Sequence, residues 1–225
     1  MAKRKVERKP DETIIDIVEA RDNFQDYVNK NKGLVGGVLA AIVLLIGGYL
    51  FYQYGIKGPR ERNAIEQISK AQEQFARDSF ALALTNPGEG FEGFVDIVDN
   101  YGGTATANTA RYYAGVCYLN LGRYDDAIEY LESVKAKGEI LSIMKFGSLG
   151  DAYSENNDMD KAKNAYKKAV SAKKNDFLTP YYMNKLALMN MTQGNVQESQ
   201  KLFAQIKEPF PESTIAAEVD KFLVK

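Results

Sequence analysis

The sequence contains no histidine and no tryptophan, and its single cysteine is Cys117. Histidine is the commonest general base and metal ligand near neutral pH, so its absence removes the usual catalytic and metal-binding chemistry. One cysteine cannot form an internal disulfide bond, and Cys117 has no histidine to activate it. We expect Cys117 to be a small core residue, and cysteine usage does not indicate the redox compartment.

The chain also lacks a phosphate-binding GxxxxGK motif and an excess of either charge, with 29 basic and 30 acidic residues. A nearly neutral chain has no long-range field that would attract nucleic acid. The carboxylate pairs Asp125-Asp126 and Asp158-x-Asp160 precede predicted helices, where acidic side chains cap free N–H groups and favour the helix dipole. We therefore predict that the protein is not an enzyme, has no cofactor or metal, and does not bind nucleic acid.

Charge is absent from one long stretch, residues 33–56, in which 12 residues are Leu, Ile, Val or Phe. A helix of about 20 apolar residues crosses the roughly 30 Å of hydrocarbon in a bilayer and satisfies its own backbone groups there. Tyrosines suit the boundary between lipid and water, and three lie near the C-terminal end of the stretch: Tyr49, Tyr52 and Tyr54. The stretch is predicted to be a transmembrane helix in contact with membrane lipid.

Two other interpretations of residues 33–56 fit less well. A buried core helix seldom runs so far without a charge. A cleaved signal peptide has an apolar region of about 7–15 residues followed by a small-x-small cleavage site, and neither feature is present. We expect an uncleaved anchor that separates residues 1–32 from a larger C-terminal domain.

The orientation follows from the basic cluster MAKRKVERK at the start of the tail, residues 1–32. Short basic segments are retained in the cytoplasm, whereas long domains are translocated largely regardless of charge. Basic residues close to the two ends of the span are similar in number, so the opposite orientation stays open. Within the tail, Thr13 and Asp16 form a capping-box-like start for a short amphipathic helix, which either binds a surface or merely leads into the span.

After the span, residues 57–107 are predicted to form a linking helix and a degenerate first repeat. Apolar spacing indicates one long helix from Arg60 to about Leu84, and Asn86-Pro87-Gly88 ends it. A second helix is expected within residues 90–103.

The following chain repeats itself with an offset of 35 residues. Aligning residues 108–134 with residues 143–169 places a small residue, an aromatic residue and an alanine at matching positions. The matched pairs are Gly115 with Gly150, Tyr118 with Tyr153, and Ala127 with Ala162. Tetratricopeptide repeats need a small residue where the first helix approaches the second, an aromatic residue between hairpins, and an alanine where the helices cross. The chain resembles this family in residues 108–142 and 143–179, and more weakly in 180–211, with a capping helix in 212–225.

The resemblance implies an all-α fold in which the transmembrane helix is followed by an α-solenoid, with a groove lined by the first helix of each repeat. Tyrosine, methionine and leucine among a few polar groups suit adaptable binding of polypeptide, although ordinary packing is the alternative at each position. The family's tryptophan position holds Arg111, Phe146 and Met183 instead. The candidate groove residues are Tyr112, Val116, Leu119, Asn120, Met144, Asp151, Glu155, Tyr181, Asn184, Leu188 and Met191.

Within the span, Gly33, Gly37 and Ala41 form a stripe of small residues at four-residue spacing. Such stripes allow close contact with another membrane helix, although glycine is common in membrane helices anyway. We list this stripe as a candidate membrane-helix contact.

The complete layout resembles the YfgM-like family. That resemblance implies a single-pass inner-membrane protein with a cytoplasmic N-terminus and a periplasmic repeat domain. Its implied partners are membrane subunits of the Sec translocon, a PpiD-type periplasmic chaperone and unfolded secreted polypeptides.

Two alternatives to this function remain. One is a cytosol-facing anchored receptor or co-chaperone, whose groove would grip a carboxylate with Lys, Arg and Asn. The projected groove contains Asn120 and Asn184 but no basic residue, which argues against it. The other alternative is a passive scaffold of an envelope complex.

Overall fold

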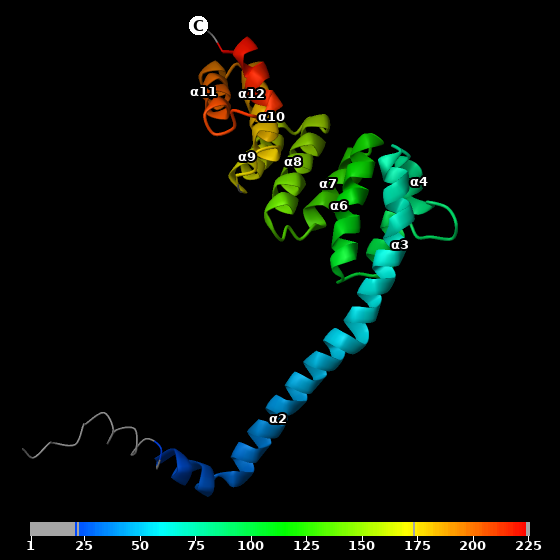
Figure 1. Cartoon of the computed structure of the whole chain (residues 1–225), viewed down its shortest axis with the longest axis vertical. Helices are drawn as coiled ribbons and strands as arrows, with labels where there is room; N and C mark the ends of the chain where they lie inside the picture. The colour runs from blue at the N-terminus through cyan, green and yellow to red at the C-terminus, as the bar shows by residue number, and fades with distance from the viewer. Residues whose placement is uncertain (1–20, 22, 173, 224–225) are drawn as a thin grey trace, which may run out of the picture. The chain divides into compact units, whose positions relative to one another are not determined.

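The computed structural model describes residues 21, 23–172 and 174–223, and all regular elements in these ranges are helical (Figure 1). The expected all-α fold is confirmed. Close contacts divide the chain into two units, Met1–Gly58 and Pro59–Lys225. We call them the N-terminal unit and the repeat unit, and each is described by itself.

The N-terminal unit contains α2 (Lys32–Phe51), which is followed by a short π-helix, η1 (Tyr52–Lys57). No residue of either element is buried. The helical stretch that begins at Lys32 is long and apolar enough to cross a membrane. The predicted capping box at Thr13 and Asp16 lies outside the described residues.

The repeat unit begins with two helices where the sequence predicted one. α3 (Gly58–Ala76) stops before Arg77, and α4 (Phe80–Thr85) follows, so the prediction of one helix from Arg60 to Leu84 was wrong. Asp78 adopts a left-handed backbone conformation (φ 57°), which interrupts the helix. The break brings the rings of Phe75 and Phe80 to 5.6 Å, whereas residues five apart in one continuous helix point in different directions.

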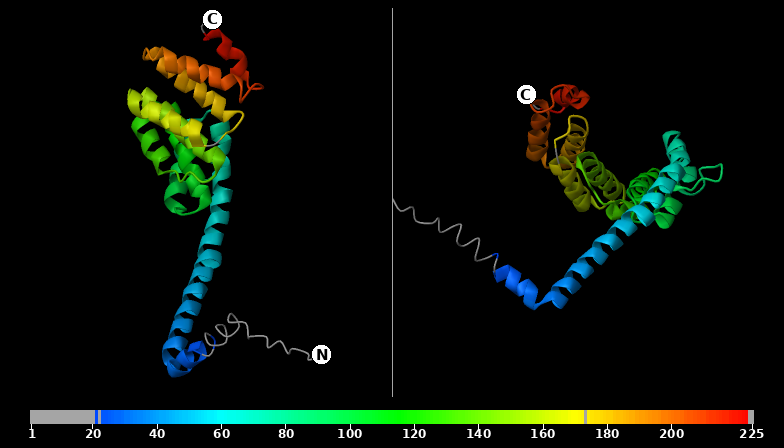
Figure 2. Two further views of the ribbon diagram at one scale, coloured as in Figure 1. Left: turned by 90° about the vertical axis from the view of Figure 1, so that its left-hand side faces the viewer. Right: turned by 60° about the horizontal axis from the view of Figure 1, so that its bottom comes forward.

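The remaining elements are helices connected by short loops, and neighbouring helices run side by side along an arc within the repeat unit (Figure 2). Figure 1 labels most of them. Their bounds are α5 (Phe94–Asn100), α6 (Ala105–Asn120), α7 (Tyr124–Ser133), α8 (Glu139–Glu155), α9 (Met159–Ala172), α10 (Leu178–Thr192), α11 (Val196–Lys207), α12 (Thr214–Glu218) and the 3-10 turn η2 (Val219–Lys221).

Small residues let the helices of a pair approach closely. A Cβ atom on Gly115 would lie 2.6 Å from Leu131 Cγ, and one on Gly150 would lie 2.4 Å from Tyr166 Cδ1. Real Cβ atoms do not come this near to other atoms, so α6 can meet α7, and α8 can meet α9, in this way only at glycine. Ala127 on α7 and Ala162 on α9 are fully buried. The packing predicted at the repeat positions is therefore present in both pairs.

Hydrogen bonds connect the start of α3 to the start of α6. The carboxylate of Glu61 accepts hydrogen bonds from the N–H groups of Ala105 (2.7 Å) and Thr106 (2.9 Å). These N–H groups belong to the first turn of α6 and have no partner within that helix. Glu61 is thus an N-terminal cap supplied by a residue more than forty positions earlier in the chain.

Candidate protein-binding groove

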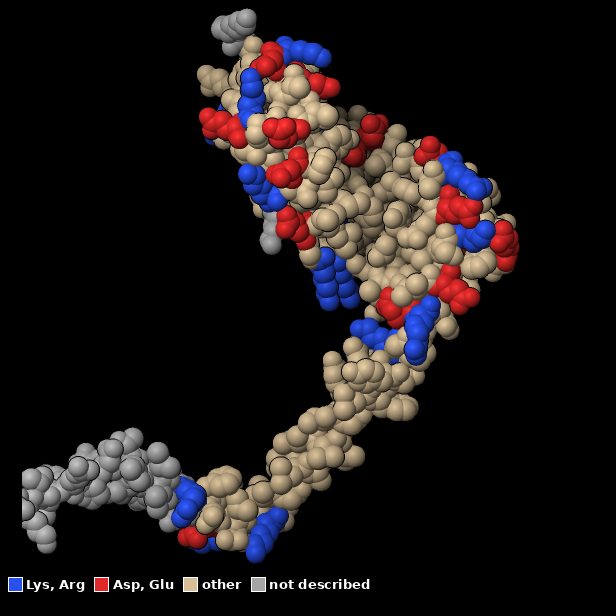
Figure 3. Space-filling view, viewed as in Figure 1, with Lys and Arg blue, Asp and Glu red and all other residues tan. Residues whose placement is uncertain are grey.

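The candidate groove is formed by the first helices of the three helix pairs, α6, α8 and α10. In Figure 3, one face of the repeat unit is hollowed in its middle, where uncharged side chains predominate and charged side chains gather along the rim. All the predicted groove residues are at least partly exposed. Exposure leaves these side chains available to a partner, and it does not by itself identify a binding site.

Tyrosines connect the three groove helices. The Tyr112 hydroxyl of α6 lies 3.3 Å from Ser148 Oγ of α8, and the Tyr182 ring of α10 packs against Gly147 of α8. A Cβ atom on Gly147 would lie 1.9 Å from Tyr182 Cζ, so only glycine allows this contact. Burial raises the pKa of both Tyr112 and Tyr182, which keeps their hydroxyls neutral.

A charged cluster lies between α8 and α10. Asp151 accepts hydrogen bonds from Lys185 Nζ (2.6 Å) and from the Tyr166 hydroxyl (2.6 Å). The side chains of Lys185 and Asp151 are only 30% and 22% exposed. Burial alone would lower the pKa of Lys185, but the carboxylate and the hydrogen bonds outweigh it and raise that pKa.

Lys185 corrects the prediction that the groove contains no basic residue. Together with Asp151 it lines a hollow of about 420 Å³ that also contains Leu119, Asn120 and Glu155. The sequence prediction assigned Asn184 to the groove and passed over the next residue. The signal was available, because a lysine one position away from a groove residue on a helix reaches the same surface with its long side chain.

The structure does not gather all the predicted groove residues at one place. Met144 lines a separate hollow with Ile140 and Leu141, near the start of α8. Asn184 has a buried side-chain oxygen without a hydrogen-bond partner in the described part of the chain. An unsatisfied buried oxygen is costly unless a donor reaches it.

The carboxylate pairs lie at the starts of α7 and α9, and among these residues, within the described chain, only Asp158 accepts a hydrogen bond from a helix N–H group. Asp125 accepts a hydrogen bond from Asn156 Nδ2 (3.0 Å), and Asp126 pairs with Arg123 Nε (2.8 Å). Asp158 accepts from the N–H of Lys161 (3.2 Å). Burial raises the pKa of the Cys117 thiol to about 12, so this side chain stays protonated at neutral pH.

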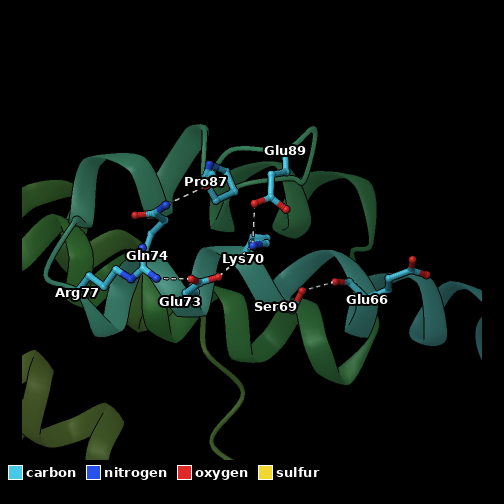
Figure 4. A network of polar contacts seen from close by, with 8 residues as sticks. All are labelled: Glu66, Ser69, Lys70, Glu73, Gln74, Arg77, Pro87 and Glu89. Carbon is cyan, nitrogen blue, oxygen red and sulfur yellow. Dashed lines mark hydrogen bonds and ion pairs between the residues drawn. The ribbon is translucent and has the colours of Figure 1, made fainter.

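A separate polar network holds the end of α3 against residues 86–92 (Figure 4). Lys70 Nζ lies 2.9 Å from Glu89 Oε1 and 3.2 Å from Glu73 Oε2, and Gln74 Nε2 donates to the Pro87 carbonyl (3.0 Å). The hydrogen bond with Glu89 is the largest cause of the raised pKa of Lys70. These groups attach a surface segment to α3.

Comparison with protein families agrees with the helix pairing. Residues 109–137 and residues 146–176 each match a model described as Tetratricopeptide repeat. The first segment contains α7 and most of α6, and the second contains α9 and the C-terminal part of α8. The chain therefore carries tetratricopeptide repeats, which are protein-interaction modules.

The comparison with curated proteins found no match. The fold and the repeats define an all-helical interaction protein with a helix long enough to span a membrane. The weaker repeat at residues 180–211 and the resemblance to the YfgM-like family stay predictions.

Proposed function

We propose that the protein is a membrane-anchored interaction module that binds polypeptide in the groove formed by α6, α8 and α10. The observation that carries this proposal is the surface of partly exposed tyrosine, leucine and polar side chains shared by these helices. Tyrosine gives large contact area at low entropic cost, and the polar side chains beside it supply hydrogen bonds to an extended main chain.

The proposed setting is the inner membrane, with the N-terminus in the cytoplasm and the repeats in the periplasm. There the protein would connect the Sec translocon with a PpiD-type chaperone or with emerging secreted chains. The stripe of Gly33, Gly37 and Ala41 supports a membrane partner, since small residues let another membrane helix approach closely. Anchoring raises the local concentration of partners, so weak groove contacts suffice.

The charge pattern of the groove weighs against the cytosolic receptor. A carboxylate-gripping groove needs a cation that is free to meet its ligand. Lys185 lies beside Asn184, as such a groove would require, but it is already paired with Asp151. A carboxylate ligand would have to displace this partner.

Site-specific photo-crosslinking in cells tests the groove. Crosslinkers at Tyr112, Tyr181 or Leu188 should capture envelope chaperones or nascent secreted chains. A crosslinker at the exposed Lys167 is the control, because α9 is not one of the groove helices, and it should capture neither. Crosslinkers at Gly37 or Ala41 should capture integral membrane subunits. Capture from the span alone would support the passive scaffold, and capture of cytosolic chaperones would support the receptor.

A reporter fusion tests the orientation. An enzyme that is active only outside the cytoplasm, fused after Lys225, should be active, because residues 1–32 carry the basic cluster. Activity of a cytoplasmic reporter in the same position would overturn the translocon proposal.

A further inference from the structure

One edge of the repeat unit carries exposed apolar side chains. In a stack of helical hairpins, the loops that lead from one hairpin to the next lie on the same edge. These loops comprise residues 101–104, 134–138, 174–177 and 208–213. We call the surface formed by these loops and the adjoining Ile140 the loop edge. Phe177 is 86% exposed, more than any other large apolar side chain in the described residues, those of α2 included. Ile140 is 56% exposed.

Hydrogen bonds hold the backbone of these loops in place. Asn175 Oδ1 accepts from the N–H groups of Phe177 (3.1 Å) and Leu178 (2.9 Å), and its own N–H donates to Thr179 Oγ1 (2.9 Å). The exposure of Phe177 is therefore imposed by an ordered turn at the start of α10.

The preceding loop is fastened in a similar way and lies next to this turn. Asn108 Oδ1 accepts from the Lys135 N–H (2.7 Å), and Asn108 Nδ2 donates to the Lys135 carbonyl (3.0 Å). Lys137, Ile140 and Asn175 line one shared hollow. The apolar side chains thus belong to one ordered surface.

Charged groups accompany the apolar side chains along the loop edge. Both signs are present, so a net charge does not distinguish this surface. Side chains that combine exposed rings with nearby ammonium groups suit the headgroup layer of a bilayer, where rings enter the acyl boundary and lysines meet phosphates. The charged residues are Lys135, Lys137, Glu139, Lys174, Asp176, Glu208 and Glu212.

The chain enters the repeat unit at this same edge. Arg60 Nη2 donates to the carbonyl of Asn100 (2.8 Å), directly before the first loop of the edge. Arg60 is four positions after Ile56, the end of the apolar stretch, and four residues of chain span about 14 Å at most. A bilayer that holds residues 33–56, as proposed above, therefore has its surface close to this end of the loop edge.

We propose that the loop edge rests on the bilayer surface, with Phe177 and Ile140 inserted among the lipid headgroups and Lys135 and Lys137 beside the phosphates. The inference rests on the proposed membrane anchor. It adds a second, peripheral lipid contact, made by the repeat unit itself. The groove helices α6, α8 and α10 all begin at this edge, so the proposal also places the groove beside the membrane surface.

The absence of tryptophan makes this contact measurable, because any introduced tryptophan is the only one in the chain. Full-length Phe177→Trp and Ile140→Trp variants would be reconstituted into phosphatidylcholine vesicles with and without brominated acyl chains. Each should lose fluorescence about two-fold in brominated vesicles, since a ring some 5–10 Å deep approaches the bromine atoms. Met159→Trp and Val196→Trp are matched controls on the opposite edge, at positions 40% and 51% exposed, and should not be quenched.

A Leu44→Trp variant separates the two proposals. Quenching at Leu44 without quenching at Phe177 and Ile140 would overturn the loop-edge contact and leave the anchor intact. No quenching at Leu44 would overturn the anchor itself. Equal quenching of the opposite-edge controls would also overturn the proposal, because the contact would not be specific to the loop edge. Circular dichroism of each variant verifies the fold, and the two loop-edge positions test the contact independently.

Discussion

At the scale of single residues, the third helix pair contains a buried hydroxyl without a partner. Ser199 of α11 is fully buried, and its Oγ makes no hydrogen bond within the described chain. It occupies a position that is alanine in the two preceding pairs, Ala127 and Ala162. Ser199→Ala should therefore raise the free energy of unfolding by about 1 kcal/mol, measured by urea denaturation, because it removes an unsatisfied polar group.

The control for this substitution is Ser171→Ala, which removes an exposed hydroxyl and should leave the unfolding midpoint nearly unchanged. A loss of stability in Ser199→Ala would contradict the prediction. It would indicate that the hydroxyl has a bound water as its partner.

The cluster around Asp151 predicts a larger effect in the opposite direction. Asp151→Ala removes the acceptor of Lys185 and of the Tyr166 hydroxyl, and leaves a largely buried ammonium without its carboxylate. We expect a loss of about 1–3 kcal/mol in the free energy of unfolding. Asp126→Ala breaks the more exposed pair with Arg123 and should cost clearly less than Asp151→Ala, because surface ion pairs contribute little. Equal losses in both variants would show that the Asp151 cluster is no stronger than a surface pair.

At the scale of helices, the packing of α6 against α7 should not tolerate a larger residue at Ala127. This fully buried alanine lies in the helix pair that contains Gly115 and Leu131. Ala127→Leu should lower the free energy of unfolding by about 1–3 kcal/mol through overpacking, and thermal denaturation followed by circular dichroism would measure it. Ala204→Leu on α11 adds the same atoms at an exposed position and should change little. An unchanged melting temperature for Ala127→Leu would contradict the repeat alignment.

The raised pKa values of two partly buried tyrosines predict a loss of stability at alkaline pH. Burial raises the pKa of Tyr130 and of Tyr153 from 10.0 to about 12. Because the folded state favours the protonated phenol, its contribution to stability is fully present below pH 10 and is lost as the pH rises toward 12. The free energy of unfolding, measured in urea at several pH values, should fall across this range. Tyr153→Phe should show a shallower fall, and an identical fall would exclude a contribution from Tyr153.

The helix pairs were predictable because each needs particular residue types at fixed spacing. Gly115, Gly150, Ala127 and Ala162 recur at one offset, and steric contact explains each of them. The break between α3 and α4 was missed because it contains neither glycine nor proline. It depends on Asp78, one of the few residue types that tolerate a left-handed backbone conformation.

The charged part of the groove could be predicted only partly. Asp151 was identified as a groove residue by its position in the repeat. Its pairing with Lys185 joins two helices from different helix pairs, and a projection of each helix separately cannot show such a contact. The exposed ring of Phe177 was missed for another reason, since apolar periodicity says nothing about side chains that project from loops.

At the scale of the whole molecule, the repeat unit should fold without the N-terminal unit. Residues 59–225 have a core of their own, which extends from Ile68 to Val219. We expect this fragment to be soluble and helical and to unfold cooperatively, as measured by circular dichroism during thermal denaturation. The full-length protein in detergent is the control. A fragment that aggregates or melts without cooperativity would show that the repeats depend on residues before Pro59.

The hydrogen bonds between the Glu61 carboxylate and the start of α6 also have a mechanical consequence. A polypeptide under tension in the groove would pull on α6, and this force would pass to α3 through the two backbone hydrogen bonds that Glu61 accepts. α3 is the helix through which the repeat unit continues toward the rest of the chain. A force on the groove would therefore pass directly from α6 to α3. The helices that follow α6 in the chain would not have to be strained first.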